Sequence, residues 1–170
     1  TGIWQVLKKC HDHGWVKQIY KPMPWCPRCG TSLSEHEMSG SYKEIEHTAV
    51  FFKVPLADKS AYMLVWTTTP WTLTANVALA VHPELSYVKA KLEGEDVPLI
   101  MGKNYFTQKF ASKGEILQEY KGEELAGLEY ETCFPELLLQ NGVDHHIVCW
   151  EEVSGEEGCG IVHIAPGCGA

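Results

Sequence analysis

The sequence has 170 residues, of which 45% are hydrophobic, and its net charge is −8 because 22 acidic residues outnumber 14 basic ones. This length suffices for one domain with a hydrophobic core and a small appendage. The charge argues against a domain that grips a long nucleic acid by itself, since such domains present basic faces to the phosphates. No apolar run reaches the roughly 20 residues that span a bilayer, and no signal-peptide pattern is present, so we expect a cytoplasmic chain without a membrane partner.

The seven cysteines are an odd number, which argues against a secreted disulfide framework. Only Cys26 and Cys29 have a spacing typical of a metal site. We expect the other five to be reduced thiols, most of them structural: Cys10, Cys133, Cys149, Cys159 and Cys168. The first residues, Thr1-Gly2 without a Met, suggest a piece of a longer chain.

The N-terminal 40 residues are predicted to be a connecting segment. Apolar residues at helical spacing predict a helix over 3–13 that stops at Gly14, and a short strand is expected over 16–20. The turn that follows holds Cys26-Pro27-Arg28-Cys29-Gly30, whose two thiolates could reach one tetrahedral zinc ion. This is half of a zinc knuckle; His36 is a candidate third ligand, although a lone histidine there is more often a surface residue.

From about residue 41 the pattern becomes β-rich, and we place the domain boundary near residue 40, with a second domain over 41–170. Strands are expected over 47–54, 61–68, 74–81, 87–92, 97–101, 115–121, 145–150 and 160–164, with a helix over 104–112. The first two strands are predicted to pair as a hairpin around Asp58-Lys59-Ser60. Many short strands with few short helices predict a β-rich α+β fold, a closed or partly closed β-barrel with peripheral helices and a small zinc-knuckle-like appendage.

Two stretches contain candidate site residues. In the first, Thr67, Thr68 and Thr69 end an apolar run, and Pro70 stops the strand, so three hydroxyls are delivered where a scaffold meets a loop. Threonine also simply favours strands, but Trp66, Trp71 and Asn76 around the three favour a polar site walled by aromatic side chains.

The second stretch, Gly158-Cys159-Gly160-Ile161-Val162-His163-Ile164-Ala165-Pro166, carries one histidine on a short apolar strand. Such a histidine is most often a satisfied core residue. A metal site at Cys159, His163 and Cys168 is a weaker alternative, because strand geometry separates the first two and a turn precedes the third.

Both stretches resemble the inserted editing domain, called CP1, of the isoleucyl-tRNA synthetase family, a class I aminoacyl-tRNA synthetase family. The run from Trp66 to Asn76, followed by Val-Ala-Leu-Ala-Val-His-Pro, is similar to its threonine-rich signature. The related valyl and leucyl enzymes usually have Thr-Thr-Arg-Pro there, whereas Thr69 stands at the position of that Arg. The second stretch resembles the family's Gly-Thr-Gly-Ile-Val-His motif with its Ala-Pro turn.

The resemblance implies hydrolysis of the ester that joins a wrong amino acid, with valine as the expected one, to the 3′ end of tRNA(Ile). It implies a pocket in which Thr67, Thr68, Thr69 and His163 are the catalytic-site residues. Substrate-binding positions would be Trp66, Trp71, Asn76, Ala165 and Pro166, and the metal positions are Cys26 and Cys29. Editing would need no cofactor; a structural zinc at the two cysteines would be completed by a second pair outside this sequence. The expected partners are the tRNA end and the rest of a parent synthetase.

Two departures from the family pattern matter. Cys159 stands where the family usually has Thr, and the family's aspartate for the substrate's α-amino group would come two residues after Ala170. A different class of function, a non-catalytic zinc-knuckle module that binds protein or RNA, also stays open at this point. Cys26 and Cys29 favour it weakly; the acidic charge and the lack of a second ligand pair oppose it.

Overall fold

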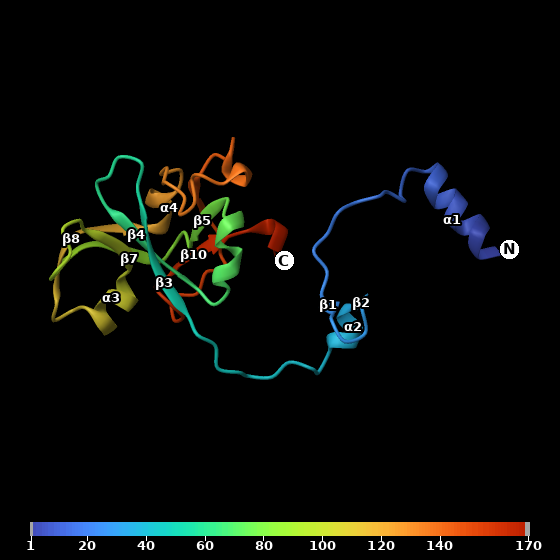
Figure 1. The fold of residues 1–170 in the computed structure, drawn as a ribbon, viewed down its shortest axis with the longest axis horizontal. Coiled ribbons are helices and arrows are strands. Elements are labelled where there is room, and N and C mark those ends of the chain that lie inside the picture. The colour runs from blue at the N-terminus through green and yellow to red at the C-terminus, as the bar shows by residue number, and fades with distance from the viewer. Residues whose placement is uncertain (1, 169–170) are drawn as a thin grey trace. The chain divides into compact units, whose positions relative to one another are not determined.

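The structure is a computed structural model that describes residues 2–168, and the chain divides into two compact units between Tyr42 and Lys43. The first unit begins with α1 (Gly2–Asp12), in which no residue is buried (Figure 1). The helix predicted over 3–13 is confirmed, with each end shifted by one residue. The strand expected over 16–20 is wrong: the segment is exposed and pairs with nothing, and a β-prone run without a partner has no ladder to join.

A small hairpin follows, formed by β1 (Trp25–Cys26) and β2 (Thr31–Ser32). Gly30 closes its turn with a φ of 67°, a left-handed conformation that glycine adopts without a steric penalty. One helical turn, α2 (Glu35–Met38), comes next, and the Ser34 N–H donates to the Glu37 carboxylate at 2.8 Å. The predicted tight turn between the cysteines is confirmed.

The second unit is built on one eight-stranded sheet (Figure 1). Its strands are β3 (Val50–Pro55), β4 (Tyr62–Thr67), β5 (Ala78–Val81), β6 (Ser86–Leu92), β7 (Leu99–Gly102), β8 (Gly114–Lys121), β9 (His146–Cys149) and β10 (Ile161–Ile164). Short helices accompany them: η1 (Pro70–Ala75), α3 (Lys103–Lys109), α4 (Gly122–Leu125), η2 (Leu138–Gln140) and η3 (Pro166–Cys168). Every strand expected in this region has a counterpart, and the segments missed are the 3-10 helices η1, η2 and η3.

The strand order is β8-β6-β7-β4-β10-β5-β9, with β3 paired to β4 in the predicted hairpin. The two ends of this path, β8 and β9, do not pair, so the sheet curls into a half-barrel instead of closing. The β-rich α+β class with short helices is confirmed, and of the two barrel forms predicted the structure has the open one. No zinc knuckle is defined by the described part of the chain.

The order also determines where the two informative stretches meet. β10 lies between β4 and β5, parallel to the former with Val162 opposite Trp66, and antiparallel to the latter with His163 opposite Leu79. The end of β4 that carries the threonines is therefore beside the strand that carries the histidine, although more than 90 residues separate them in sequence.

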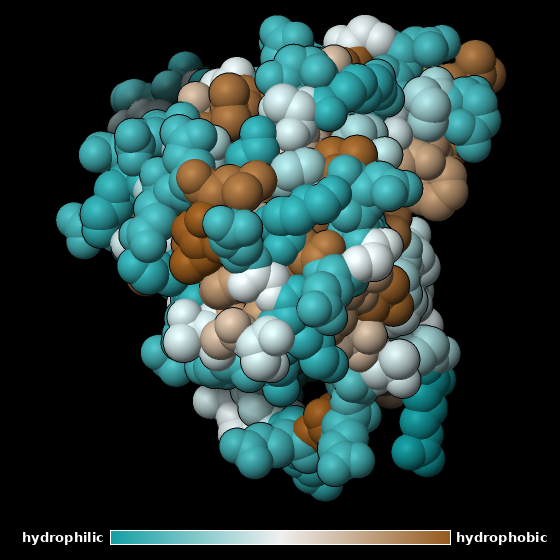
Figure 2. All heavy atoms as spheres, turned by 90° about the vertical axis from the view of Figure 1, so that its left-hand side faces the viewer, coloured by the Kyte–Doolittle hydropathy of each residue, from teal (hydrophilic) through white to brown (hydrophobic). Residues whose placement is uncertain are grey.

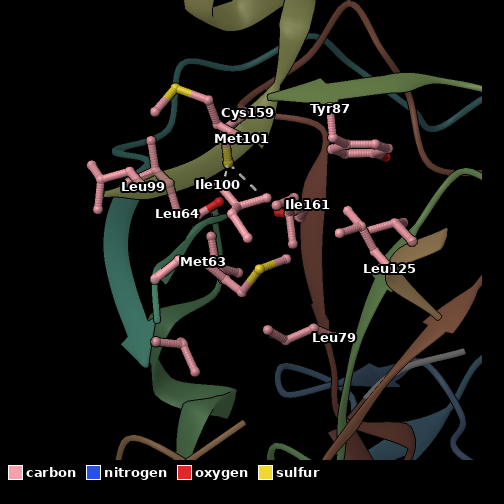
Figure 3. Close-up of a cluster of buried hydrophobic side chains, with 14 of the residues drawn as sticks. Met63, Leu64, Leu79, Tyr87, Leu99, Ile100, Met101, Leu125, Cys159 and Ile161 are labelled. Atoms are coloured by element: carbon pink, nitrogen blue, oxygen red, sulfur yellow. Dashed lines mark hydrogen bonds between the residues drawn. The ribbon is translucent and has the colours of Figure 1, made fainter. Parts of the chain in front are cut away.

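The core lies inside the curl of the sheet and includes Met63, Leu79, Ile100, Leu125 and Ile161 (Figure 3). Tyr87 is fully buried among them; its phenol donates to the Gly160 carbonyl at 2.8 Å and accepts from the His82 N–H at 2.9 Å. Burial raises the pKa of Tyr87 to about 12, so its hydroxyl stays protonated.

The face of the molecule shown in Figure 2 is mainly hydrophilic, and its apolar residues form small separate groups. Among residues 2–168, no helix has both the length and the apolar character that crossing a membrane would require.

Candidate functional site

The threonine stretch forms a sharp turn between β4 and η1. Thr67 is the last residue of β4, and Pro70 is the first of η1, where its fixed φ suits a helical turn and its missing N–H costs nothing. The Thr72 N–H donates to the Thr69 carbonyl at 3.0 Å and closes the first turn of η1. The sequence thus delivers its hydroxyls at a strand end, as predicted.

Hydrogen bonds among these threonines hold the turn. Thr67, which is buried, accepts the Thr69 N–H on its Oγ1 at 3.1 Å, and the hydroxyls of Thr67 and Thr69 lie 3.3 Å apart. Thr72 donates its hydroxyl to the Thr69 carbonyl at 2.8 Å. Thr67 and Thr72 therefore shape the turn from inside, whereas Thr69 is exposed.

His163 joins the turn from β10. Its Nε2 lies 2.7 Å from the Thr72 Oγ1, and its Nδ1 lies 3.5 Å from the Asn76 Nδ2. The ring is half-buried, and this burial lowers the pKa of His163 below that of a free histidine, because a charged ring would be poorly solvated. The histidine is thus a neutral, hydrogen-bonded part of the site at pH 7.

These residues border a pocket of about 510 Å³, a size typical of small-ligand sites. Its lining is mostly apolar, and none of its residues is acidic or a lysine or arginine. The lining residues are Thr69, Thr72, Val148, Cys149, Trp150, His163, Ile164, Ala165, Pro166 and Cys168.

Four of the predicted site residues line this pocket together, namely Thr69, His163, Ala165 and Pro166. Thr67 and Asn76 are buried behind it and hold Thr69 and His163. Thr68 is half-buried and is not in the lining.

The two predicted aromatic residues lie outside the lining. The Trp66 ring packs under Gly158, where an added Cβ would come within 2.5 Å of it, and the side chain also contacts the core. Trp71 is 69% exposed on η1. The aromatic side chain that does line the pocket is Trp150, which directly follows β9 and is 46% exposed.

Sequence reasoning did not identify Thr72, Trp150 or Tyr130. Thr72 had a usable signal, since it stands three residues after Thr69 in a segment begun by proline. Trp150 and Tyr130 had no such signal in the sequence. Trp150 follows an ordinary edge strand. Tyr130 reaches the site only through Asn76, whose Oδ1 accepts a hydrogen bond from the Tyr130 hydroxyl at 2.6 Å.

The two candidate metal ligands of the first unit are close to each other. The Cys29 N–H donates to the Cys26 Sγ at 3.4 Å, and hydrogen bonds from Cys29 lower the pKa of Cys26, which favours the thiolate that zinc prefers. Residues 2–168 contain no group of three His, Cys, Asp or Glu side chains placed to share an ion, so His36 does not complete this pair. The residues present fit two of the four ligands of a structural zinc site.

The same observation counts against a metal site at Cys159, His163 and Cys168. Cys159 is fully buried, and its thiol donates to the Leu64 carbonyl at 2.9 Å (Figure 3). Burial raises the pKa of Cys159 to about 12, so the side chain is a neutral donor and not a thiolate ligand.

Comparison with known proteins gives a family match over most of the chain. The family described as tRNA synthetases class I (I, L, M and V) matches residues 1–132. An isoleucine–tRNA ligase of Bacillus thuringiensis is 40% identical over 169 residues, which are 99% of this chain and 16% of the relative. That of Pyrococcus horikoshii is 40% identical over 181 residues, 99% of this chain and 17% of the relative. The chain thus spans about a sixth of the length of these relatives.

Solved structures show the same fold. The match to the structure of GlLeuRS-CP1 includes 68% of this chain and 54% of that one, with a TM-score of 0.54 and 16% identity. The editing domain of the cytosolic leucyl-tRNA synthetase of P. knowlesi covers 69% of this chain, which covers 58% of it, with a TM-score of 0.53 and 16% identity. At this identity, the likeness concerns the fold alone.

Proposed function

The chain belongs to the class I tRNA synthetases of the I, L, M and V group, and on that premise we propose that it is the editing domain of an isoleucyl-tRNA synthetase. In this proposal residues 41–170 hydrolyse the ester of Val-tRNA(Ile), and residues 1–40 connect them to the rest of the enzyme. The observation that carries it is the uncharged pocket where Thr69, Thr72 and His163 meet.

An editing site is needed because binding alone discriminates poorly between valine and isoleucine. Isoleucyl-tRNA synthetase is itself the established example: one methylene is worth only about 1–3 kcal/mol in a pocket, so a second site must destroy the smaller, wrong product. Such a site must admit a small aliphatic side chain and exclude a larger one. Apolar walls closed by a fixed ring at His163 suit that task.

The ester of an aminoacyl-tRNA is already activated, so its hydrolysis needs a placed water and donors for the developing oxyanion. In this proposal the hydroxyl of Thr69, an exposed residue whose backbone is fixed by Thr67 and Thr72, holds the terminal ribose or the water. The chain has no Gly-x-Ser-x-Gly elbow, and no serine lines the pocket, which favours direct attack by water over a covalent serine intermediate.

The partner in this proposal is the 3′ end of tRNA(Ile). Trp150 offers a half-exposed aromatic face at the pocket, on which a terminal base can stack. The net charge of −8 fits a domain that touches only that end while the rest of the synthetase holds the tRNA. A structural zinc at Cys26 and Cys29 would need two ligands from elsewhere in the enzyme.

The test is hydrolysis of Val-tRNA(Ile) and Ile-tRNA(Ile) by the synthetase that carries this chain. Thr69→Ala should slow cleavage of the valyl ester. His163→Ala should enlarge the pocket and reduce the preference for Val over Ile by roughly 10- to 200-fold, the worth of one methylene. Leu117→Ala, on exposed strand β8, is the control. The proposal fails if neither Thr69→Ala nor His163→Ala changes either rate.

A further inference from the structure

The strongest unexplained feature of the site lies behind His163, where buried side chains form a hydrogen-bonded chain. Tyr130 and Asn76 are 4% and 6% exposed, and neither lines the pocket. They connect to His163 from segments far apart in sequence, since Tyr130 precedes β9 and Asn76 follows η1. Buried polar groups of this kind are costly unless they are fully satisfied, so their arrangement requires an explanation.

The orientation of the Asn76 amide is unambiguous. Its Nδ2 lies 2.9 Å from the Ala78 carbonyl, which can only accept a hydrogen bond, so the amide nitrogen must face that oxygen. Its Oδ1 accepts the hydroxyl of Tyr130 at 2.6 Å. Both ends of the amide are therefore fixed, and the second N–H of Nδ2 is directed to the His163 Nδ1 at 3.5 Å.

This orientation determines which His163 nitrogen carries the proton. An amide nitrogen only donates, so Nδ1 must supply a lone pair, and in a neutral ring the proton is then on Nε2. Nε2 donates to the Thr72 Oγ1 at 2.7 Å, which leaves the hydroxyl proton of Thr72 free for the Thr69 carbonyl at 2.8 Å. The opposite tautomer would put two N–H groups face to face at Asn76 and would take the Thr72 proton away from Thr69.

We propose that Tyr130 and Asn76 are positioning residues that hold His163 as the neutral imidazole protonated on Nε2. The inference rests on the proposed function for its meaning, because it makes His163 a fixed, uncharged wall of the pocket and not a general base. Neither ring nitrogen has a free lone pair to take a proton from water. An uncharged ring also leaves the α-ammonium group of an aminoacyl ester unopposed, whereas an imidazolium would repel it.

The titratable groups around His163 support this state. Tyr130 and His145 lie behind Asn76, with their rings 5.4 Å apart, and burial raises the pKa of the first and lowers that of the second, so both are neutral at pH 7. Cys149 and Cys168 line the pocket, and His146 pairs with Ala78 on the neighbouring strand. Among the described residues, no carboxylate lines the pocket beside His163.

The test is nitrogen-15 NMR of the histidine rings in the uniformly labelled 170-residue chain, with the His163 signals identified by their loss in His163→Gln. At pH 7 and above the wild type should show one protonated nitrogen, Nε2, and the ring should take up its second proton only at a lower pH than a free histidine does. Tyr130→Phe keeps the ring and removes the donor to Asn76, so the amide is free to turn and the two tautomers of His163 should mix. Tyr87→Phe, which removes a different buried phenol, should leave the His163 signals unchanged.

Asn76→Asp gives the opposite polarity and covers the case in which Tyr130→Phe unfolds the chain. A carboxylate accepts, so it should move the proton to Nδ1 and raise the pKa of His163. The inference is overturned if wild-type His163 carries its proton on Nδ1, titrates as an ordinary histidine, or is unaffected by both variants. These spectra need no tRNA, so a chain with the predicted tautomer but no hydrolysis of Val-tRNA(Ile) by its synthetase would refute only the proposed function.

Discussion

Replacing Gly158 by alanine should test how closely this residue packs against the Trp66 ring. The residue has a φ of 60°, and an added Cβ would lie 2.5 Å from the Trp66 ring, against the 3.5–4.0 Å of a normal carbon contact. The left-handed conformation costs about 1–2 kcal/mol for a residue with a Cβ, and moving the packed indole costs about 1–3 kcal/mol more. Gly158→Ala should therefore lower the free energy of unfolding by roughly 2–5 kcal/mol.

The matched control is Gly127→Ala, because Gly127 has a φ of 81° but nothing within 4 Å of its added Cβ. This variant should lose only the backbone contribution, about 1–2 kcal/mol. Urea unfolding followed by circular dichroism measures both, and an m-value of about 1–3 kcal/mol per M puts the difference within reach.

The same comparison in a Trp66→Leu background tests the cause. With a smaller side chain below it, Gly158→Ala should cost no more than Gly127→Ala, which gives a coupling of about 1–3 kcal/mol between the two positions. If Gly158→Ala is equally costly in both backgrounds, Trp66 does not pack as described, and the assignment of Trp66 to the scaffold is wrong.

Three further outcomes are expected. Cys159→Thr should be more stable than the isosteric Cys159→Val by about 1 kcal/mol in urea unfolding, because only threonine keeps a donor to the Leu64 carbonyl; equal stability would show that this bond contributes nothing. The free energy of unfolding should fall as the pH drops below about 6.5, because the unfolded chain then binds protons that folded His163 and His145 resist; a pH titration in which His163→Gln has the same slope as wild type would contradict this. Trp150→Ala should weaken binding of an aminoacylated tRNA end by about 1–3 kcal/mol, measured as KM of the synthetase, and an unchanged KM would remove the stacking role.

The strands of the half-barrel were predictable because their signal is local. Each is a short apolar, β-branched run bounded by proline, glycine or a polar turn, as in β4 with Pro70 behind it. The run over 16–20 shows where this local prediction fails, because its pattern is similar but it pairs with no other strand. Whether a β-prone run becomes a strand depends on a partner that the run itself does not specify.

The site was predictable in part for the same reason. Thr69 and His163 could be named from their own neighbourhoods and from the resemblance of those neighbourhoods to a known motif. The groups that fix His163 could not all be named in this way. Tyr130 acts through Asn76, which lies 54 residues away in sequence, and Asn76 acts on His163, which lies 87 residues away. No periodicity in the sequence carries information over such distances. The contacts between these residues form only when the sheet brings their segments together.

The position of β10 has a consequence for how the molecule folds. β4 and β5 are separated by only ten residues, yet they do not pair; the slot between them is filled by β10, about 80 residues later in the chain. Closing that loop is entropically costly and makes the slot slow to fill. A chain still emerging from the ribosome therefore exposes two unpaired strand edges and has no pocket. The edges are covered once β10 has been made and paired, and the pocket is complete once the chain through Cys168 is in place.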